Sequence, residues 1–410
     1  MKVWVKLLVG AVLGLLLGVF LPAANQTAAG VFEFLAQLAI SIGRYTAAAV
    51  LLFSLVVGIY ELRQDGGFWR LLLRTLLIIA GTAVFVIGAG LFVASIFPPE
   101  RIPILTVESA ERLLLDTGRL VLDLFPANML SIAGGEGVYL FPLCIFAFFL
   151  ALGLSYDKNY TKQLMSLIDS LSRVFYHIAA FFSEILGLLI IILAAYWAIR
   201  YQNITDARVF RAILRLLLIF GILLAVVVMP LFLYLVKKYK TPWKVVYASL
   251  GSAFAAFFSG DINFCLPLFI QQSKENLGIR RRANALVTII WTSFGRAGSA
   301  VVAVISLLVI IKSYSSLDLY KSDIFRIAFN TFLISFLLAR NPGDGAFAAL
   351  AALCGSYGHG IETGYLILKP VAFYLISIGA FLDIMLASFG CFAVTRICGF
   401  QTERSTKQFI

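Results

Sequence analysis

The sequence predicts an all-α polytopic membrane protein with eight transmembrane helices and two re-entrant helical hairpins. Hydrophobic residues make up 61% of the 410 residues, and charged residues only 13%. Because soluble domains carry about a quarter charged residues, this composition excludes an ordinary soluble protein. Apolar runs of membrane-crossing length recur along the chain. Two further runs are interrupted by Gly, Pro and Asp, which indicates hairpins that enter the membrane and return.

Eight apolar runs are long enough to cross the bilayer, and several exceed the necessary length, which predicts tilt or breaks. The first resembles a signal peptide, but Gly10, Gly14 and Gly18 recur every four residues. That spacing suits close helix packing, so we expect an uncleaved first helix. The eight spans are predicted at residues 4–24, 30–62, 68–97, 119–155, 165–200, 207–237, 283–312 and 364–399.

The two interrupted segments are expected at residues 245–275 and 323–360. The first contains Ser259–Pro267 and the second contains Arg340–Gly345, each with Gly, Pro and an Asp inside an apolar stretch. Backbone that is not helical survives at membrane depth only if it is buried in protein or lines a wet cavity. A pair of such segments in corresponding places is typical of the binding site of a secondary transporter.

The basic residues indicate orientation rather than a nucleic-acid partner. The net charge is +12, but Lys and Arg are spread over short loops between apolar runs, which is the positive-inside pattern. This pattern places both termini in the cytoplasm and makes the two hairpins enter from opposite sides. The basic loops that carry this prediction are 63–74, 158–162, 237–240, 274–282 and the tail from 396.

Other chemistries find little support in the sequence. The five cysteines have no metal-binding spacing and mostly lie in apolar segments, so we interpret them as small buried hydrophobes. No nucleophile–base arrangement, phosphate loop or cofactor motif is present. Two alternatives to a transporter remain: a channel with its pore between the re-entrant loops, and a membrane-embedded enzyme that uses Asp261 and Asp344 as a catalytic pair.

Several short motifs together resemble the dicarboxylate/amino acid:cation symporter family, the glutamate-transporter type, over nearly the whole chain. The resemblance implies a homotrimer in which a transport domain slides like an elevator against a scaffold domain. It places the scaffold at 1–64 and 119–204, and the transport domain at 65–118 and 205–410. The motifs, in order, are Leu8–Gly18, Ser54–Gly58, Phe125–Asn128, Cys265–Pro267, Asn341–Ala346 and Phe381–Asp383.

The chain departs from this family at the cation-binding positions. The stretch that matches the family's unwound seventh span is Gly295–Ser299, which lacks the family's Asn and Asp and has Arg296 in addition. In the last helix, Gly390 and Val394 stand where the family carries two sodium ligands. Sodium needs about five or six oxygen ligands. Side-chain hydroxyl groups that could bind the ion remain at Thr82, Ser293 and Ser299. We therefore hypothesise that Arg296 stands in for a bound cation and pairs with Asp383, Asp261 or Asp344. The alternative is a purely structural ion pair.

The expected substrate-binding residues come from three places. In the last helix, Asp383 matches the residue that meets the substrate's amino group in the family, and Leu386 replaces the arginine that holds a side-chain carboxylate. The remaining candidates are Ala387 in the last helix, Asp261 and Asn263 in place of a serine-rich first tip, and Gly343, Asp344 and Gly345 at the second tip. Asp261 and Asn263 have the alternative role of capping helices, Asp344 that of a turn residue, and Asp383 that of a partner for Arg296 alone.

The expected function is secondary active transport of a small amino acid or related organic acid, with weakened or absent sodium coupling. A neutral amino acid is the favoured substrate, because Leu386 cannot hold a second carboxylate. The alternative within the same class is a sodium- or proton-coupled symporter for glutamate, aspartate or dicarboxylates. The expected partners are the lipid bilayer of a bacterial inner membrane, the small-molecule substrate, Na⁺ or H⁺ as coupling ion, and two further copies of the chain.

Overall fold

The computed structural model is helical in almost every part that it describes. It describes residues 2–20, 26–97, 101–103, 138–156, 158–204, 207–237, 239, 241–314, 321–358, 360–404, 406 and 409. Within these residues there is no β-strand, only an isolated bridge between Ile279 and Gln401. The all-α prediction is confirmed. The predicted motif Phe125–Asn128 and most of the predicted fourth span lie outside the described residues.

Eight helices in the described part are long and apolar enough to cross a membrane. Seven of them coincide with predicted spans. The eighth, Lys321–Arg340, was expected as the first arm of the second hairpin rather than as a span. The described part of the predicted fourth span is a shorter apolar helix, α6 (Phe141–Tyr156). The first arm of the second predicted hairpin is therefore long and apolar enough to cross a membrane, although it is the least apolar of the eight helices.

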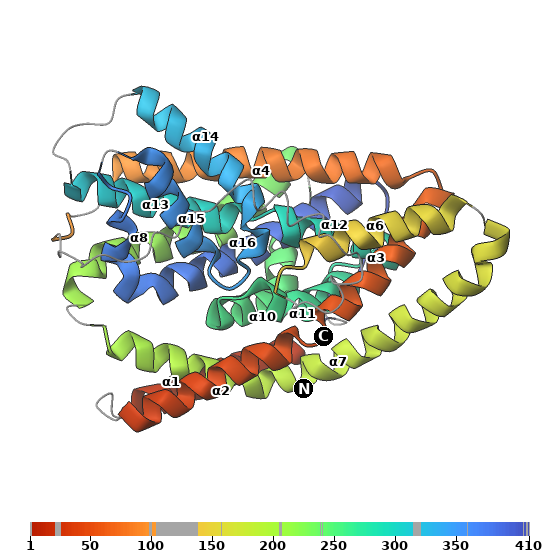
Figure 1. Cartoon of the computed structure of the whole chain (residues 1–410), viewed down its shortest axis with the longest axis horizontal. Helices are drawn as coiled ribbons and strands as arrows, with labels where there is room; N and C mark the ends of the chain where they lie inside the picture. The colour runs from red at the N-terminus through yellow and green to blue at the C-terminus, as the bar shows by residue number, and fades with distance from the viewer. Residues whose placement is uncertain are drawn as a thin grey trace.

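Of the predicted scaffold helices, α1, α2 and α7 lie along the lower side of the molecule, whereas α3 lies further in, beside α6 (Figure 1). Helices α2 and α3 are one membrane-length element that breaks at Tyr45–Thr46, and α7 runs for 45 residues along the lower edge in that view. The bounds of these helices are α1 (Val3–Phe20), α2 (Gln26–Arg44), α3 (Ala47–Gln64) and α7 (Lys158–Gln202).

The predicted glycine contact of α1 is confirmed. A Cβ atom added at Gly10, Gly14 or Gly18 would overlap a backbone carbonyl oxygen of α7. The absence of side chains at these three positions therefore lets the two helix backbones approach closely.

The core of the molecule is built from helices of the predicted transport domain. In the most apolar 18-residue stretch of each segment, 94% of the residues are buried in α12–α13 and 89% in η4–α16, but only 28% in α4. Helices α12, α13 and α16 are therefore central, and α4 is peripheral. The π-helical turn η2 (Leu224–Val228) lies just before Pro230, which has no N–H group to continue the α-helical ladder. The bounds are α4 (Phe68–Ile96), α8 (Ala207–Leu223), α9 (Met229–Lys237), α12 (Arg281–Phe294), α13 (Ala297–Tyr314), η4 (Gly364–Val371) and α16 (Ala372–Ile397).

Two helix pairs occupy the predicted hairpins. The first pair joins α10 (Trp243–Ser259) to α11 (Ile262–Glu275) through Gly260, whose φ of +66° favours glycine. The second pair joins α14 (Lys321–Leu337) and the 3₁₀ turn η3 (Leu338–Arg340) to α15 (Gly345–Tyr357). We call residues 260–263 the first tip and residues 341–345 the second tip. The N–H of Ile262 donates to the carbonyl of Pro342 at 3.3 Å, so the two tips meet.

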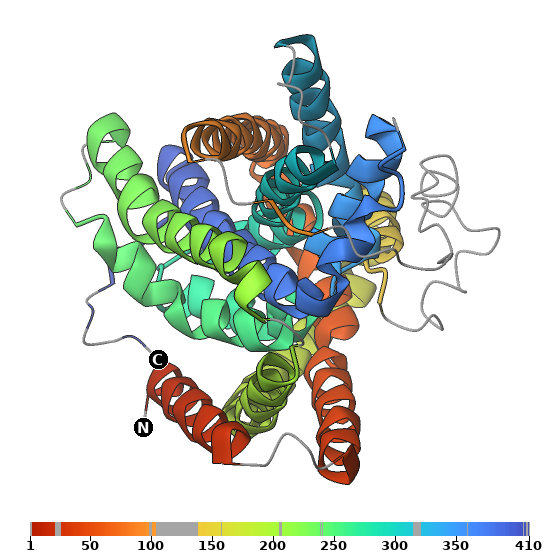
Figure 2. The same ribbon diagram turned by 90° about the vertical axis from the view of Figure 1, so that its left-hand side faces the viewer.

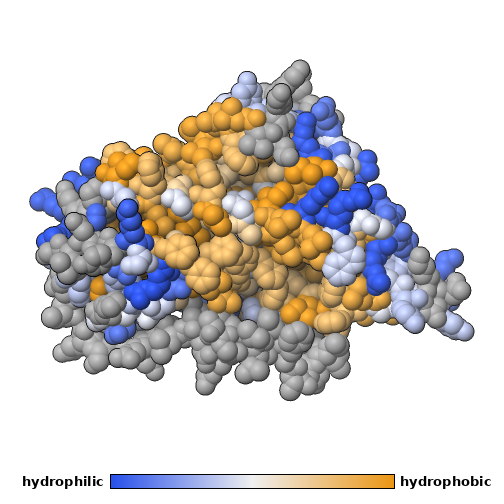
Figure 3. All heavy atoms as spheres, turned by 90° about the horizontal axis from the view of Figure 1, so that it is seen from above, coloured by the Kyte–Doolittle hydropathy of each residue, from blue (hydrophilic) through white to orange (hydrophobic). Residues whose placement is uncertain are grey.

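The surface has the pattern of a membrane protein. Figure 3 shows a broad apolar belt between two polar ends. Large apolar side chains such as Leu77, Phe92 and Leu188 are exposed. The two chain ends lie close together in both ribbon views (Figures 1 and 2). This arrangement is the one expected when both termini are on the same side of the membrane.

Candidate functional site

A buried ion pair lies at the break between α12 and α13. Helix α12 ends before Gly295, α13 begins at Ala297, and Arg296 stands in the break. The Nε atom of Arg296 donates to Oδ2 of Asp383 on α16 at 2.8 Å, and both side chains are 2% exposed. Of the three partners predicted for Arg296, the structure selects Asp383.

The carboxylate of Asp383 is also bound by the first turn of α13. The backbone N–H of Ser299 donates to Oδ1 at 2.9 Å, and its hydroxyl donates to Oδ2 at 2.6 Å. Three donors and one full positive charge therefore hold this carboxylate. Ala387, one turn further along α16, is also buried. An ammonium group would have to share a carboxylate whose charge Arg296 already balances.

Arg296 keeps one donor group without a partner. One terminal nitrogen is 3.4 Å from the carbonyl of Leu338, whereas the other, Nη2, is buried and has no hydrogen-bond partner among the described residues. A Cβ atom added at Gly345 would overlap Nη2, so this nitrogen faces the start of α15. The first N–H groups of a helix also lack partners within the helix. The two features together leave buried N–H donors of the kind that bind anions.

The first tip carries a second buried carboxylate. Asp261 is the N-cap of α11, where its Oδ1 accepts from the N–H of Phe264 at 3.1 Å. Its Oδ2 accepts from Nε of Arg44 at 2.6 Å and also contacts a terminal nitrogen of Arg44. The side-chain amide of Asn263 donates to the carbonyl of Val138 at 2.7 Å. The capping role considered for Asp261 is therefore present, whereas Asn263 binds a loop carbonyl.

The second tip closes over this ion pair. A Cβ atom added at Gly343 would lie 3.1 Å from a terminal nitrogen of Arg44 and 3.3 Å from Oδ2 of Asp261. Asp344 at the same tip is exposed, and its side chain does not cap α15. The structure thus brings Asp261 and Gly343 together on one side, and Arg296, Asp383 and Gly345 together on the other.

Sequence reasoning missed Arg44. This residue ends α2 at the break in the second membrane-length helix, inside the apolar run predicted at 30–62. An ionisable residue in the middle of a membrane span is a functional candidate by default, so its position alone could have revealed it. Its partner, 217 residues away, was not predictable from the sequence.

The predicted cation positions do not converge on one point. Thr82 and Gly390 line an apolar cavity of about 460 Å³, whose lining does not include Ser293, Gly295 or Arg296. Ser293 instead lies 3.9 Å from the sulfur of Cys144. A Cβ atom added at Gly390 would overlap the six-membered ring of buried Trp291, so an indole fills the space beside this position. Among the described residues, these positions show no shared set of side-chain oxygen atoms.

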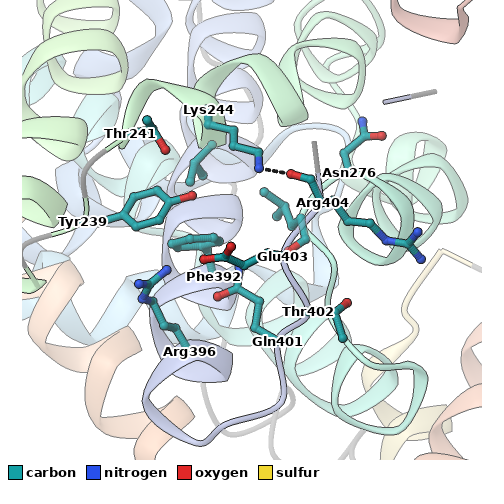
Figure 4. A pocket seen from close by; sticks show the side chains of 12 residues that line it. Tyr239, Thr241, Lys244, Asn276, Phe392, Arg396, Gln401, Thr402, Glu403 and Arg404 are labelled. Carbon is teal, nitrogen blue, oxygen red and sulfur yellow. Dashed lines mark hydrogen bonds between the residues drawn. The ribbon is translucent and has the colours of Figure 1, made fainter. Parts of the chain in front are cut away.

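No metal centre of another kind is evident within the described ranges. They contain no group of three or more His, Cys, Asp or Glu side chains that could hold a metal ion. A separate cavity of about 420 Å³ lies between α10, the end of α16 and the C-terminal tail (Figure 4). Lys244 on its wall donates to the carbonyl of Arg404, which ties the tail to the base of the first helix pair.

Comparison with known families decides the class of protein. The model of the sodium:dicarboxylate symporter family matches residues 3–397, nearly the whole chain. The chain belongs to the sodium:dicarboxylate symporter family. As a member of this family, the protein is a secondary transporter in a membrane and not an enzyme. The hypothesis that Asp261 and Asp344 form a catalytic pair is therefore wrong. A comparison with curated proteins returned no significant match.

Proposed function

We propose that this protein carries a small solute with one carboxylate, an amino acid or a related organic acid, across the membrane. The observation that supports this proposal is the unpartnered Nη2 of buried Arg296, which faces the start of α15 at Gly345. A guanidinium N–H and the N-terminus of a helix are both suited to a carboxylate. Because Leu386 stands where the family carries an arginine, α16 offers no cation at this position for a second carboxylate, so a monocarboxylate fits better than glutamate or aspartate.

We also propose that Arg296 replaces the sodium ion that the family's description names. Its charge is permanent and neutralises Asp383, which is the only carboxylate bonded to it in the described part of the chain. The indole of Trp291 against Gly390 further argues against an ion at the family's position in the last helix. Transport is then expected to proceed without a sodium gradient.

The proposed mechanism is the movement of residues 65–118 and 205–410 against residues 1–64 and 119–204. The meeting of two helix tips, one from each predicted hairpin, beside Arg296 supports it, because opening either tip would expose the same site. On the basis of the family resemblance, we also propose that the protein is a homotrimer in which the scaffold helices form the contacts between copies.

Uptake by the full chain in proteoliposomes tests this function. A panel of radiolabelled amino acids and small organic acids is supplied with an inward sodium gradient or with potassium in place of sodium. We expect saturable uptake of at least one monocarboxylate, equal in both salts, and loss of this uptake in Arg296→Met. Arg70→Met, the same substitution at an exposed arginine of α4, is the control that should keep it.

Two results would contradict the proposal. Uptake that requires sodium and survives Arg296→Met would show that Arg296 does not replace a cation. Flux that rises without saturation would instead favour the channel hypothesis.

A further inference from the structure

Three cavities adjoin along one face of α16, because neighbouring cavities share wall residues. The polar cavity of about 420 Å³ shares Tyr239, Phe392 and Arg396 with a second cavity of about 260 Å³. The second cavity shares two residues of α16, Ala393 and Ile397, with the apolar cavity of about 460 Å³. We call the three together the α16 groove. It is polar at the end of α16 and apolar further along the helix.

The length of the groove matches one leaflet of a bilayer. Along α16 its walls extend from Leu386 to Arg396. Ten residues of α-helix are about 15 Å long. The hydrocarbon core of a bilayer is about 30 Å thick. The groove therefore covers the depth that one acyl chain occupies.

The apolar end of the groove opens toward lipid. Leu77 of α4 and Phe232 of α9 line it, and 70% and 49% of their surface is exposed. The rings of Phe85 and Phe232 meet between the two helices, with their centroids 6.0 Å apart. Thr82 carries the only polar side chain in this part of the lining among the described residues. Because a water molecule needs two to four polar partners, an apolar occupant is favoured here.

The polar end of the groove is basic. Lys244 of α10 and Arg396 of α16 line it from two different helices (Figure 4). Within the described part of the chain, neither residue forms an ion pair. Arg404 of the tail is a third cation in the lining, and Glu403 is the only acidic residue there among those described. The polar end thus has an excess of positive charge.

Arg396 is oriented for an anion at the junction of the polar and apolar cavities. The carbon atom of its guanidinium group lies 4.5 Å from the ring centroid of Tyr239. Stacking on a ring occupies one face of the guanidinium plane and leaves its N–H edges available. These edges match the oxygen atoms of a phosphate group.

Aromatic residues indicate that the polar end lies at the membrane–water interface. Trp243, the first residue of α10, is 56% exposed, and its indole N–H donates to the carbonyl of Val226 at 3.1 Å. Trp and Tyr are enriched at this level of a membrane. The tail and the basic loops beside it are on the predicted cytoplasmic side. Basic pockets between membrane helices on that side suit anionic lipid head groups.

We propose that the α16 groove binds one anionic phospholipid. Its phosphate lies between Lys244 and Arg396, and one of its acyl chains fills the apolar cavity. All walls of the groove belong to the predicted transport domain and its tail, so the lipid is bound by a single region. The inference uses neither Arg296 nor the identity of the transported solute, and it does not depend on the proposed function.

Native mass spectrometry of the full chain, delipidated in detergent, tests the proposal. The probes are phosphatidylglycerol and phosphatidylcholine with the same acyl chains, and glycerol 3-phosphate as a head group without chains. We expect one phosphatidylglycerol per chain, bound roughly tenfold more tightly than phosphatidylcholine, because each cation near the head group favours the anionic lipid. Glycerol 3-phosphate alone should bind far more weakly than the lipid.

Variants test the two ends of the groove separately. The double variant Lys244→Gln, Arg396→Gln should lose the preference for phosphatidylglycerol. The control Arg70→Gln, Lys162→Gln removes the same charge from exposed positions outside the groove and should keep it. Glu403→Gln removes the acidic residue and should strengthen binding about fivefold.

Ala393→Phe places a ring in the apolar part and should weaken binding of phosphatidylglycerol several-fold. Its melting temperature without added lipid, compared with that of the unaltered chain, reports whether the variant is folded.

Three results would overturn the inference. Equal binding of both lipids would show that the polar end does not select a charge. Unchanged affinity in folded Ala393→Phe would show that no acyl chain enters the groove. Glycerol 3-phosphate bound as tightly as the lipid would indicate a site for a soluble phosphate instead.

Discussion

At the scale of single residues, the site is defined by which charges neutralise each other. Arg296 and Asp383 form one buried pair, and Arg44 and Asp261 form another. A buried pair is weak evidence for stability, because desolvation of two charges offsets much of their attraction. What matters for function is which polar groups the two pairs leave without a partner or make dependent on one. The first pair leaves Nη2 of Arg296 without a hydrogen-bond partner among the described residues, and the second makes Asp261 depend on a partner from another region.

Substitution of Arg296 should lower the free energy of unfolding, and substitution of Asp383 as well should restore part of it. Arg296→Met leaves Asp383 charged and buried, which is expected to lower the free energy of unfolding by about 3–5 kcal/mol. The double variant Arg296→Met, Asp383→Leu has no uncompensated charge and should unfold at a higher temperature than the single variant. Thermal unfolding of the purified chain in detergent measures both. Equal melting temperatures for the two variants would contradict this account.

At the scale of elements, glycine determines how closely α1 lies against α7. Three glycines spaced four residues apart put backbone against backbone over the length of α1. Apolar side chains gain little from meeting one another in lipid, so close packing is what holds two membrane helices together. The same reasoning makes this contact sensitive to any added side chain.

Gly14→Leu should therefore separate α1 from α7. Overpacking of this kind costs about 1–3 kcal/mol, and the melting temperature in detergent should fall accordingly. Gly88→Leu is the matched control on α4, where a Cβ atom would meet nothing within 4 Å. If Gly88→Leu is as damaging as Gly14→Leu, the packing explanation is wrong.

The backbone around another glycine, Gly278, holds the C-terminal tail. Gly278, with φ of +69°, turns the chain between α11 and α12, and its carbonyl accepts from the N–H of Thr402 at 2.8 Å. The N–H of Arg280 donates to the carbonyl of Phe400 at 3.0 Å. The tail thus ties the end of α16 to the base of the first helix pair.

Gly278→Ala should release this tail. A Cβ atom at position 278 would overlap the carbonyl oxygen of Thr402, in addition to a strain of about 1 kcal/mol for the left-handed backbone. We expect faster hydrogen exchange at Arg280 and Thr402, measured by mass spectrometry. Gly66→Ala, at a similar φ of +66°, would meet nothing within 4 Å, so in this control variant the tail should stay protected.

At the scale of the whole molecule, two ion pairs among the described residues cross between the predicted scaffold and the predicted transport domain, Arg44 with Asp261 and Arg281 with Asp169 on α7. A third pair joins Arg282 to Asp65, which directly follows α3 at the predicted boundary between the two regions. The last two pairs are at least 30% exposed on each side. Each is therefore expected to contribute at most about 1 kcal/mol, and less at high salt. They stabilise the arrangement seen here without locking it.

The double variant Arg281→Gln, Arg282→Gln should shift the molecule toward a state in which the two regions lie apart. Loss of about 1–1.5 kcal/mol in total corresponds to a change of roughly tenfold in the equilibrium. Spin labels on the scaffold and transport regions measure the populations, and added salt should reproduce part of the shift in the unaltered chain. Arg63→Gln, at an exposed arginine that forms no ion pair with the described residues, is the control. Unchanged populations in the double variant would show that these pairs do not hold the two regions together.

The sequence by itself determined the class of the molecule, its membrane-length helices and the two interrupted segments. These depend on composition and on the local order of apolar, Gly, Pro and Asp residues, which tertiary packing does not change. It also singled out Arg296, because a fixed charge in a membrane span must be paired. Only the tertiary structure decided the pairing, since the partners lie 87 and 217 residues apart along the chain. Arg44 became part of the site because α2 breaks where the first tip packs against it, a contact that no local pattern encodes.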